Sequence, residues 1–491
     1  MRMPPSVAQV KGGQVAKKDQ ESYRCPACGY RSPKWMGFCP SCHEAPEGLV
    51  PEESPGGRVD RYVREATGTS SESRALPISG VVVGELPRSS TGLSEFDRVL
   101  GGGIVPGSFI LLGGDPGIGK STLVLQVVSN LAREKTVLVV CGEESPEQIR
   151  MRFDRLEAGK KKHSGLYLLP ETDLSLVLAE AARLSPDILI VDSIQTVFLP
   201  EWTQSAGSVI QLRETAATLL EFAKRSRVTT LVIGHVTKDG TIAGPRVLEH
   251  LVDTVLYLEG ERGQPLRILR TAKNRFGPTQ EVGLFEMEEG GLVEVTNPSA
   301  FFLEGRDPGR PGSTVVCGME GSRPILVELQ ALAAPTSLPM PRRVTQGVSS
   351  NRLALLTAVL VRRIGLDLSG MDLYLNVVGG VEIEETALDL GIALGVVSSV
   401  RELVLPAGWV VVGEVGLAGE VRRIPGIYER MNEAARLGFS HMVGPVLPSG
   451  KARALPRGLV YHPVNDLRAA LAFLEKPQPS EKKSSSSGNP R

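Results

Sequence analysis

Residues 114–121, GDPGIGKS, have the spacing G-x4-G-K-S, which is typical of a loop that binds the phosphates of a nucleotide. In such a loop, backbone N–H groups point at the phosphate oxygens, the lysine reaches the β- and γ-phosphates, and the following hydroxyl binds Mg²⁺. An apolar run precedes the loop and an apolar helical pattern follows it, so the positive end of a helix also faces the phosphates. The sequence therefore predicts a site for ATP and Mg²⁺ whose binding residues are Gly114, Asp115, Pro116, Gly117, Ile118, Gly119, Lys120, Ser121 and Thr122.

Two further apolar runs end in acidic residues that suit the same chemistry. DILIVDS places Asp192 at its end, where a carboxylate would hold Mg²⁺ and its shell, and VLVVCGEES places Glu143 and Glu144 at its end. A carboxylate there can orient and deprotonate the water that attacks the γ-phosphate. Glu143 is the preferred base because it is nearer the strand end, with Glu144 as the alternative. An acid at a helix N-terminus, favoured by the helix dipole, is the competing interpretation.

Other polar residues follow strand-like runs. His235 in IGHVTKDG is suited to sensing the γ-phosphate, and a capped core histidine is an equally good interpretation. TAKNRFG places Lys273 and Arg275 on one side of a strand end. Two cations there could form a finger that reaches a neighbouring subunit and neutralises charge in the transition state, although such a pair is often only a solvated turn.

Four of the six cysteines form a cluster, with the spacing C-x2-C-x10-C-x2-C. Each C-x2-C pair turns two thiolates toward one point, and four thiolates suit tetrahedral Zn²⁺ in a closed, structural site. Four reduced thiols without a metal are the alternative, and His43 is expected to be a bystander. The predicted zinc ligands are Cys25, Cys28, Cys39 and Cys42. The pattern does not indicate what the ribbon contacts.

The elements that must position these residues form an α/β pattern. Short apolar runs alternate with helical patterns up to about residue 300, which predicts a largely parallel sheet with helices on both faces. A mixed α/β region follows a Gly- and Pro-rich break. The predicted organisation is a disordered tail (1–20), a zinc finger (21–48), a linker (49–77), an ATPase domain (78–300), a second α/β domain (301–475) and another disordered tail (476–491).

The composition excludes some classes of protein. The 491 residues contain 55 Lys and Arg against 55 Asp and Glu, so no global field draws the chain to nucleic acid or anionic lipid. Any polyanion site must therefore come from local basic patches. No apolar run is long enough to span a bilayer, and the first residues have no apolar signal core, so a cytoplasmic protein is expected.

Several motifs together resemble one known family. TGLSEFDRVLGGGIVPGSFILLGGDPGIGKSTLVLQ, CGEES, VDSIQTV, GHVTKDGTIAGPRVLEHLVDTVLYLEG and KNRFG, behind a four-cysteine finger, resemble the bacterial RadA (Sms) family of DNA-repair proteins. The likeness covers nearly the whole chain apart from the tails, and KNRFG is its most specific part. It implies a RecA-type ATPase core and a C-terminal domain like that of the Lon protease. It also implies a hexameric, ring-shaped motor on single-stranded DNA that acts with the RecA recombinase in branch migration.

The resemblance also implies a role for individual residues. Lys120 and Ser121 become ligands of phosphate and Mg²⁺, Asp192 the Walker B acid and Glu143 the water-activating carboxylate. The two cations of KNRFG act at a neighbouring subunit's nucleotide, and the four cysteines bind zinc. The family usually has a tryptophan three residues after the last cysteine, where this chain has Ala45.

The C-terminal domain is expected to lack protease activity. VEIEETALDLGIALGVVSS and GEVGLAGEVRRIPGIYERMNEAARLGF resemble the segments that carry the Ser–Lys dyad of Lon-type proteases. The serine position holds Ala387 and the lysine position holds Tyr428, so the nucleophile and its amine base are both missing. The domain would serve as a scaffold that presents basic residues to nucleic acid, with an ordinary solvated surface as the alternative. The candidate pairs are Arg342 with Arg343 and Arg422 with Arg423.

In RecA-type rings, the loops that follow the Walker B strand and the sensor strand face the channel. Here these loops contain Trp202, Lys238 and Arg246, which suit stacking on a base and neutralising phosphates. Three functions therefore compete: a DNA-dependent motor in recombination, a RecA-like signalling ATPase without nucleic acid, and an ATP-driven protease. The missing dyad disfavours the protease. The signalling ATPase gives no reason for the zinc finger or KNRFG, so the motor is preferred.

Overall fold

The computed structural model describes residues 23–24, 31–32, 34, 36–38, 40, 50–51, 77–78, 87–156, 164–235, 248–261, 263–447 and 454–475. The chain divides into two compact units, Met1–Glu72 and Ser73–Arg491. Several predictions fall outside the described residues: the four cysteines, His43, Ala45, most of the linker, both tails, Lys238 and Arg246.

The first unit contains a small antiparallel sheet in which β1 lies between the other two strands. The strands are β1 (Tyr23–Arg24), β2 (Arg31–Ser32) and β3 (Val50–Pro51). Beside them, the hydroxyl of Ser32 donates to the carbonyl of Lys34 at 2.7 Å.

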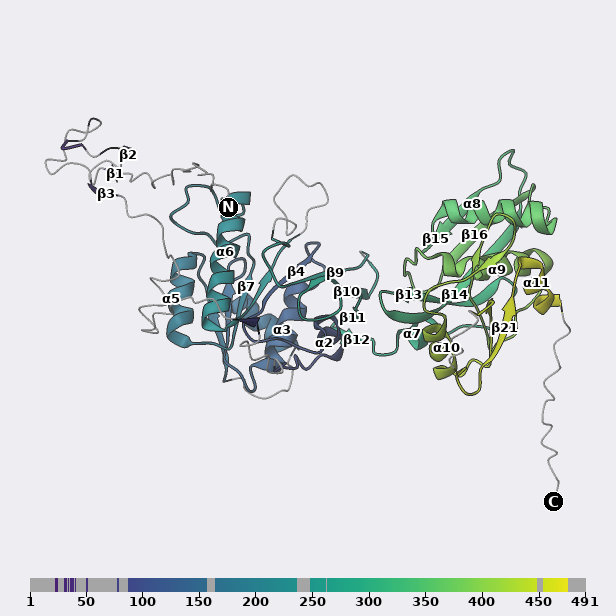
Figure 1. Ribbon diagram of the computed structural model, residues 1–491, viewed down its shortest axis with the longest axis horizontal. Coiled ribbons are helices and arrows are strands. Elements are labelled where there is room, and N and C mark those ends of the chain that lie inside the picture. Colours follow the sequence, from purple (N-terminus) through teal and green to yellow (C-terminus); the bar gives the residue numbers. More distant parts are fainter. Residues whose placement is uncertain are drawn as a thin grey trace, which may run out of the picture. The chain divides into compact units, whose positions relative to one another are not determined.

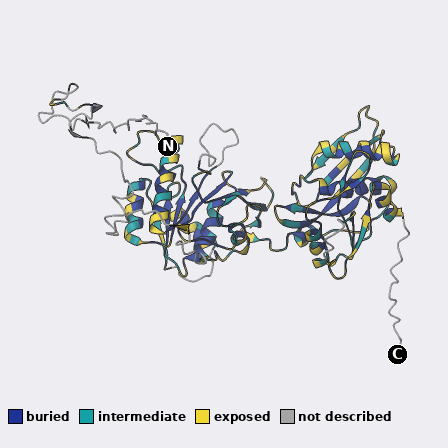
Figure 2. Ribbon diagram, viewed as in Figure 1, coloured by how far each residue is buried: buried dark blue, intermediate teal, exposed yellow. Residues whose placement is uncertain are grey.

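The second unit begins with a nine-stranded sheet of order β12-β11-β10-β9-β4-β8-β7-β5-β6 (Figure 1). Six neighbouring strands are parallel and almost wholly apolar, because both faces of that part of the sheet are covered. They are β4 (Phe109–Gly114), β5 (Val137–Cys141), β6 (Leu166–Leu169), β7 (Ile188–Asp192), β8 (Thr229–Ile233) and β9 (Thr254–Glu259). Figure 2 shows the buried central strands in dark blue.

Helices cover both faces of this sheet, as predicted. One apolar cluster joins the sheet to Phe96, Leu123 and Ile149, and a second joins its other face to Leu178 and Leu219. The helices on the first side are α2 (Ser94–Leu100), α3 (Lys120–Leu131) and α4 (Pro146–Leu156), and those on the second side are α5 (Leu174–Leu184) and α6 (Val209–Ser226).

The parallel arrangement ends at β10. This strand (Leu266–Asn274) pairs antiparallel with β9 and with β11 (Val282–Glu288), and β12 (Gly291–Glu294) is antiparallel to β11. The connection between β9 and β10 spans only residues 260–265, which is too short for the crossover that a parallel neighbour needs. The run LRILRTA therefore returns beside β9 as an antiparallel strand.

The C-terminal part is a second α/β layer structure with a seven-stranded sheet of order β15-β16-β14-β13-β17-β20-β21. The strands are β13 (Ser313–Glu320), β14 (Arg323–Pro335), β15 (Arg343–Gln346), β16 (Met371–Val377), β17 (Trp409–Val411), β20 (His441–Pro445) and β21 (Val460–Val464), beside a hairpin of β18 (Glu414–Val415) and β19 (Val421–Arg422). The helices are α7 (Pro298–Phe302), α8 (Ser350–Val359) with its π-helical extension η3 (Leu360–Ile364), the 3₁₀ turn η4 (Thr386–Leu388), α9 (Asp389–Arg401), α10 (Ile427–Arg436) and α11 (Leu467–Glu475).

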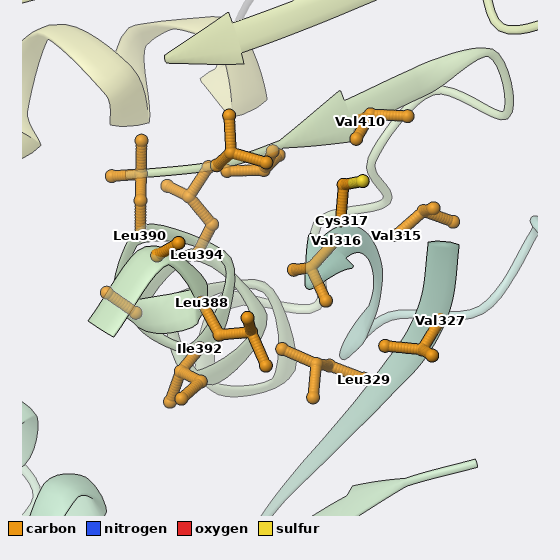
Figure 3. Packing of buried hydrophobic residues seen from close by; sticks show 14 of the residues in the cluster. Val315, Val316, Cys317, Val327, Leu329, Leu388, Leu390, Ile392, Leu394 and Val410 are labelled. Carbon is orange, nitrogen blue, oxygen red and sulfur yellow. The ribbon is translucent and has the colours of Figure 1, made fainter. Parts of the chain in front are cut away.

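Helix α9 lies close against β13 and β14. Figure 3 shows Ile392 and Leu394 in the same apolar cluster as Val316 and Leu329 of the sheet. A Cβ atom at Gly391 would lie 2.1 Å from the Val316 side chain, so only glycine permits this approach. The segment ALDLGIALGVVSS is thus apolar because the helix is buried in this core.

Candidate active site

The phosphate-binding loop connects β4 to α3 in the geometry that its sequence predicts. Gly114 has φ 152° and Gly119 has φ 115°, in the region that side chains disfavour. A Cβ atom at Gly114 would also lie 2.5 Å from the carbonyl oxygen of Leu258 on the neighbouring strand β9. The helix begins at Lys120, so its first N–H groups face the loop where phosphate oxygens are expected.

Lys120 is buried at the start of α3, with 4% of its surface exposed. Its Nζ donates to the carbonyl oxygens of Gly114 and Asp115, each at 2.9 Å, and lies 3.1 Å from Nδ1 of His235. Burial lowers the pKa of Lys120, while the carboxylates of Asp192, Glu143 and Asp115 favour its charged form. The ammonium group therefore lies in a confined acidic site.

Asp192 lies at the end of β7, between the ends of β5 and β8. It pairs in register with Cys141 on one side and with Ile233 on the other. Burial raises the pKa of Asp192, and a hydrogen bond with the Ser121 side chain opposes that shift. Ser121 and Asp192 thus bring two oxygen ligands together beside the loop, which fits Mg²⁺ because this ion takes few protein ligands and completes its shell with phosphate and water.

Glu143 lies two residues beyond β5, on one side of Asp192. Its Oε1 is 3.0 Å from Nε2 of His235, and it also accepts a hydrogen bond from the hydroxyl of Ser193. The hydrogen bond from His235 is the largest cause that lowers the pKa of Glu143 to about 2, with Ser193 acting in the same direction and burial against it. Glu143 is therefore ionised throughout the neutral range.

Glu144, the neighbouring acid, pairs with a different residue from those that contact Glu143. Its carboxylate forms an ion pair with Arg152 of α4. The two adjacent acids consequently have different partners: Glu143 joins the group around Lys120 and Asp192, and Glu144 joins the helix that follows.

Lys273 and Arg275 lie at the end of β10, next to a register shift between Thr271 and Lys273. The Nζ of Lys273 donates to the carbonyl oxygens of Glu249 and His250 at 2.7 and 3.3 Å. Arg275 is 3.3 Å from the buried carboxylate of Asp253, and 55% of its side chain is exposed. Burial lowers the pKa of Lys273, and the nearby Arg275 acts in the same direction.

A cavity of about 730 Å³ lies beside the phosphate-binding loop. Its volume suits a nucleotide, because ligand pockets usually measure about 300–1,000 Å³. In its wall, the hydroxyl of Tyr257 donates to Glu249 at 2.7 Å. The cavity is lined by Gly114, Asp115, Ile118, Glu249, Tyr257, Leu258, Glu259 and Gly260.

Sequence reasoning missed three residues that organise this region: Ser193, Arg152 and Asp253. Ser193 adjoins Asp192 and Asp253 is an acid at the start of an apolar strand, so both had a local signal, whereas the role of Arg152 depends on how α4 packs. Trp202, a candidate for base stacking, packs against the apolar cluster under α5 and α6. Part of its side chain therefore packs against the hydrophobic core.

In the C-terminal part, the two positions aligned with a protease dyad are built into the fold. Ala387 is fully buried in η4, and its carbonyl accepts from the N–H of Gly413. Two residues beyond Tyr428 on α10, the fully buried Arg430 pairs with Glu385. This segment of α10 therefore anchors the turn that leads into α9.

The four arginines proposed as a basic surface differ in their contacts. Arg343 donates to the backbone carbonyls of Arg342, Leu368 and Met371, and Arg422 pairs with Glu420. Arg342 and Arg423 are exposed. In the described ranges, no helix is both long and apolar enough to cross a membrane.

Family models match three parts of the chain. An AAA domain matches residues 77–241, a rubredoxin metal binding domain matches residues 23–44, and subunit ChlI of Mg-chelatase matches residues 357–447. A solved structure, a KaiC-like protein PH0186 from Pyrococcus horikoshii, is 21% identical, covers 43% of this chain and 99% of its own, and has a TM-score of 0.36.

Curated relatives match almost end to end. DNA repair protein RadA of Bacillus subtilis is 48% identical over 429 residues, covering 87% of this chain and 93% of the relative. The proteins of the same name from Halalkalibacterium halodurans and Streptococcus pyogenes serotype M6 are 50% and 49% identical, each over 88% of this chain and 93% of the relative. The chain therefore belongs to the RadA family of DNA repair proteins, as an ATP-hydrolysing enzyme with a RecA-type core, a rubredoxin-like ribbon and a ChlI/Lon-like domain.

Proposed function

We propose that this protein is a ring-shaped, DNA-dependent ATPase that moves on single-stranded DNA and promotes branch migration in homologous recombination. The observation that carries the proposal is the meeting of Lys120, Glu143 and Asp192 beside one phosphate-binding loop. The relatives' names associate this machinery with DNA repair. The proposed domains are those of the sequence analysis: 21–48, 78–300 and 301–475.

Each group at the loop has a proposed part in hydrolysis. Lys120 binds the β- and γ-phosphates, and Ser121 and Asp192 hold Mg²⁺, which neutralises the charge that builds on the leaving phosphate. Glu143 orients the attacking water and accepts its proton. The ionised carboxylate of Glu143 and the closeness of all four groups support these assignments.

We further propose that Lys273 and Arg275 act on a neighbouring subunit's nucleotide in a homo-hexamer. Arg275 has 55% of its side chain exposed and its guanidinium paired with Asp253 through Nη1, which supports a cation that is positioned at a surface. A head-to-tail contact of this kind, repeated around an axis, closes a ring. The proposed partners are single-stranded DNA, recombination intermediates and the RecA recombinase.

Steady-state ATP hydrolysis with and without single-stranded DNA, at low and moderate salt, tests this function. We expect DNA to stimulate turnover, and we expect its apparent affinity to fall by at least about tenfold between about 50 and 200 mM salt, because two or three phosphate contacts alone give that factor and contacts from further subunits of a ring add to it. Turnover that is indifferent to DNA at both salt concentrations would contradict the motor. It would favour a signalling ATPase.

The N-terminal ribbon is expected to bind one zinc ion per chain through its four cysteines. Metal analysis of the purified protein should find about one equivalent of zinc, and Cys28→Ser should lose it because a three-thiolate site holds the ion much more weakly. Cys317→Ala is the matched control, since Cys317 lies buried in the C-terminal core. Equal zinc content in both variants would refute the assignment.

The Lon-like domain is expected to be a scaffold without protease activity. Casein incubated with the protein, ATP and Mg²⁺ should stay intact, because Ala387 offers no nucleophile and Tyr428 no amine base. Cleavage that disappears in the Lys120→Ala variant would show instead that the domain is an ATP-driven protease.

A further inference from the structure

His235 connects two groups of the hydrolytic site that the sequence places far apart. It lies two residues beyond the end of β8, and its carbonyl oxygen is 3.4 Å from the side-chain nitrogen of Gln195. Its ring has Lys120 on one side, at 3.1 Å from Nδ1, and Glu143 on the other, at 3.0 Å from Nε2. One imidazole thus bridges the phosphate-binding ammonium and the proposed base.

The donors in this bridge can be assigned from its chemistry. The ammonium of Lys120 has only protons to offer, and it already donates to the carbonyl oxygens of Gly114 and Asp115. Nδ1 of His235 must therefore accept the third proton of Lys120. Nε2 then carries the ring proton and donates to Glu143, whose ionised carboxylate can only accept.

The bridge also distinguishes the two oxygens of Glu143. His235 and Ser193 both donate to Oε1. In the part of the chain that the structure describes, no hydrogen bond to Oε2 of Glu143 is found. The two donors hold the carboxylate by one oxygen and leave the other to accept the proton of the attacking water, which is what a positioned general base requires.

We propose that His235 is a positioning residue that couples Lys120 to Glu143: when nucleotide binds, Lys120 exchanges the carbonyl oxygens of Gly114 and Asp115 for phosphate oxygens and keeps its hydrogen bond to Nδ1, so that one ring aligns the lysine and the base. The proposal rests on the proposed roles of Lys120 and Glu143 in hydrolysis. His235 itself contacts neither the phosphate nor the water in this scheme. Its effect should therefore fall on the chemical step and leave nucleotide binding nearly unchanged.

Two substitutions of His235 separate its hydrogen bonds from its packing. His235→Ala removes the acceptor and the donor together. In His235→Gln, the amide oxygen and nitrogen flank one carbon atom, as Nδ1 and Nε2 flank Cε1 in imidazole, so the side chain again offers one acceptor and one donor. The amide can thus restore the bridge without a ring.

The test compares kcat, the affinity for fluorescent ADP and the midpoint of thermal unfolding in the two variants and the wild type. We expect His235→Ala to lower kcat by roughly 10- to 100-fold with ADP affinity within about twofold of wild type, and His235→Gln to recover most of kcat. If His235→Ala keeps wild-type kcat, or if it lowers kcat, affinity and the unfolding midpoint together and glutamine restores none of them, the positioning role is wrong.

The result is separable from the proposed function. Loss of turnover in Glu143→Gln together with normal turnover in His235→Ala would refute the bridge and leave the hydrolytic roles intact. Normal turnover in Glu143→Gln would instead overturn the assigned base, whatever His235 does.

Discussion

Replacing Lys120 with alanine is expected to abolish ATP turnover, lowering kcat by about 10³-fold or more, because it removes a buried cation that we propose binds the transferred phosphate. Two carboxylates, those of Glu143 and Asp192, would also lose the nearby positive charge of the ammonium. The remaining site would repel the γ-phosphate. A coupled or malachite-green assay with saturating ATP and Mg²⁺ measures the loss.

The same substitution should leave the fold intact. Burial lowers the pKa of Lys120, so the folded chain binds this proton more weakly than the unfolded chain does. At neutral pH, below the ordinary lysine pKa, the charged ammonium therefore costs folding stability, and removing it relieves that cost. The substitution also removes the hydrogen bonds of the ammonium to Gly114, Asp115 and His235, which opposes this gain, so we expect the midpoint of thermal unfolding of Lys120→Ala to lie close to that of the wild type.

A matched control lies just beyond the same helix. Arg133 is an exposed cation after α3, so Arg133→Ala removes one positive charge without touching the loop. It should hydrolyse ATP at the wild-type rate. The assignment of Lys120 would be wrong if Lys120→Ala kept more than about a tenth of wild-type kcat, since a loss that small is less than one oxyanion donor usually supplies.

That Asp192, Glu143 and His235 lie close together could be predicted from the sequence for a simple physical reason, although other residues of the region were missed. Parallel strands end at one edge of a sheet, so polar residues that follow apolar runs must gather there. Asp192 lies between the ends of β5 and β8, and Glu143 and His235 follow those two strands. The glycine spacing of the loop predicted its backbone in the same way, because positive φ at Gly114 and Gly119 requires that residue type.

The contacts within the site could not be predicted, because they depend on rotations and packing that leave no local pattern. His235 fitted both a phosphate sensor and a core residue until its ring was found between Lys120 and Glu143. The different partners of the two acids likewise depend on the packing of α4, which brings Arg152 to Glu144; Glu143 as the base stays a proposal. Strand β10 is antiparallel to β9 because the connection between them is short. The length of that connection depends on where the two strands end, which the sequence pattern did not define.

The buried carboxylate of Asp253 holds Arg275, one of the two cations at the end of β10. Its carboxylate, 2% exposed, accepts from the backbone N–H of Phe109 at 3.0 Å, and it pairs with Lys224 and Arg275. A buried carboxylate with this many donors is well compensated and rigidly placed. It holds the guanidinium of Arg275 through Nη1, 3.3 Å from the carboxylate, while 55% of that side chain is exposed.

An equal mixture of Arg275→Ala and Lys120→Ala subunits is expected to regain ATP turnover that neither variant has alone. The first has an intact loop and no finger, and the second has an intact finger and no lysine. If the two kinds of subunit are distributed at random in a ring, about a quarter of the subunit boundaries join an intact loop to an intact finger. Turnover should therefore approach about a quarter of the wild-type value. Lys273→Ala should behave in the same way.

The dependence of ATP turnover on the proportion of the two variants distinguishes action between subunits from action within one chain. Action between subunits predicts turnover that is zero for each pure variant and highest near equal proportions, since the productive boundary needs one of each. Action within one chain predicts no turnover at any ratio, because every subunit then carries a defect in its own site.

The same ring argument predicts that the wild-type protein is oligomeric when nucleotide and oligonucleotide are bound. Light scattering measures this, and a monomer under those conditions would remove the basis for a finger that reaches a neighbouring subunit.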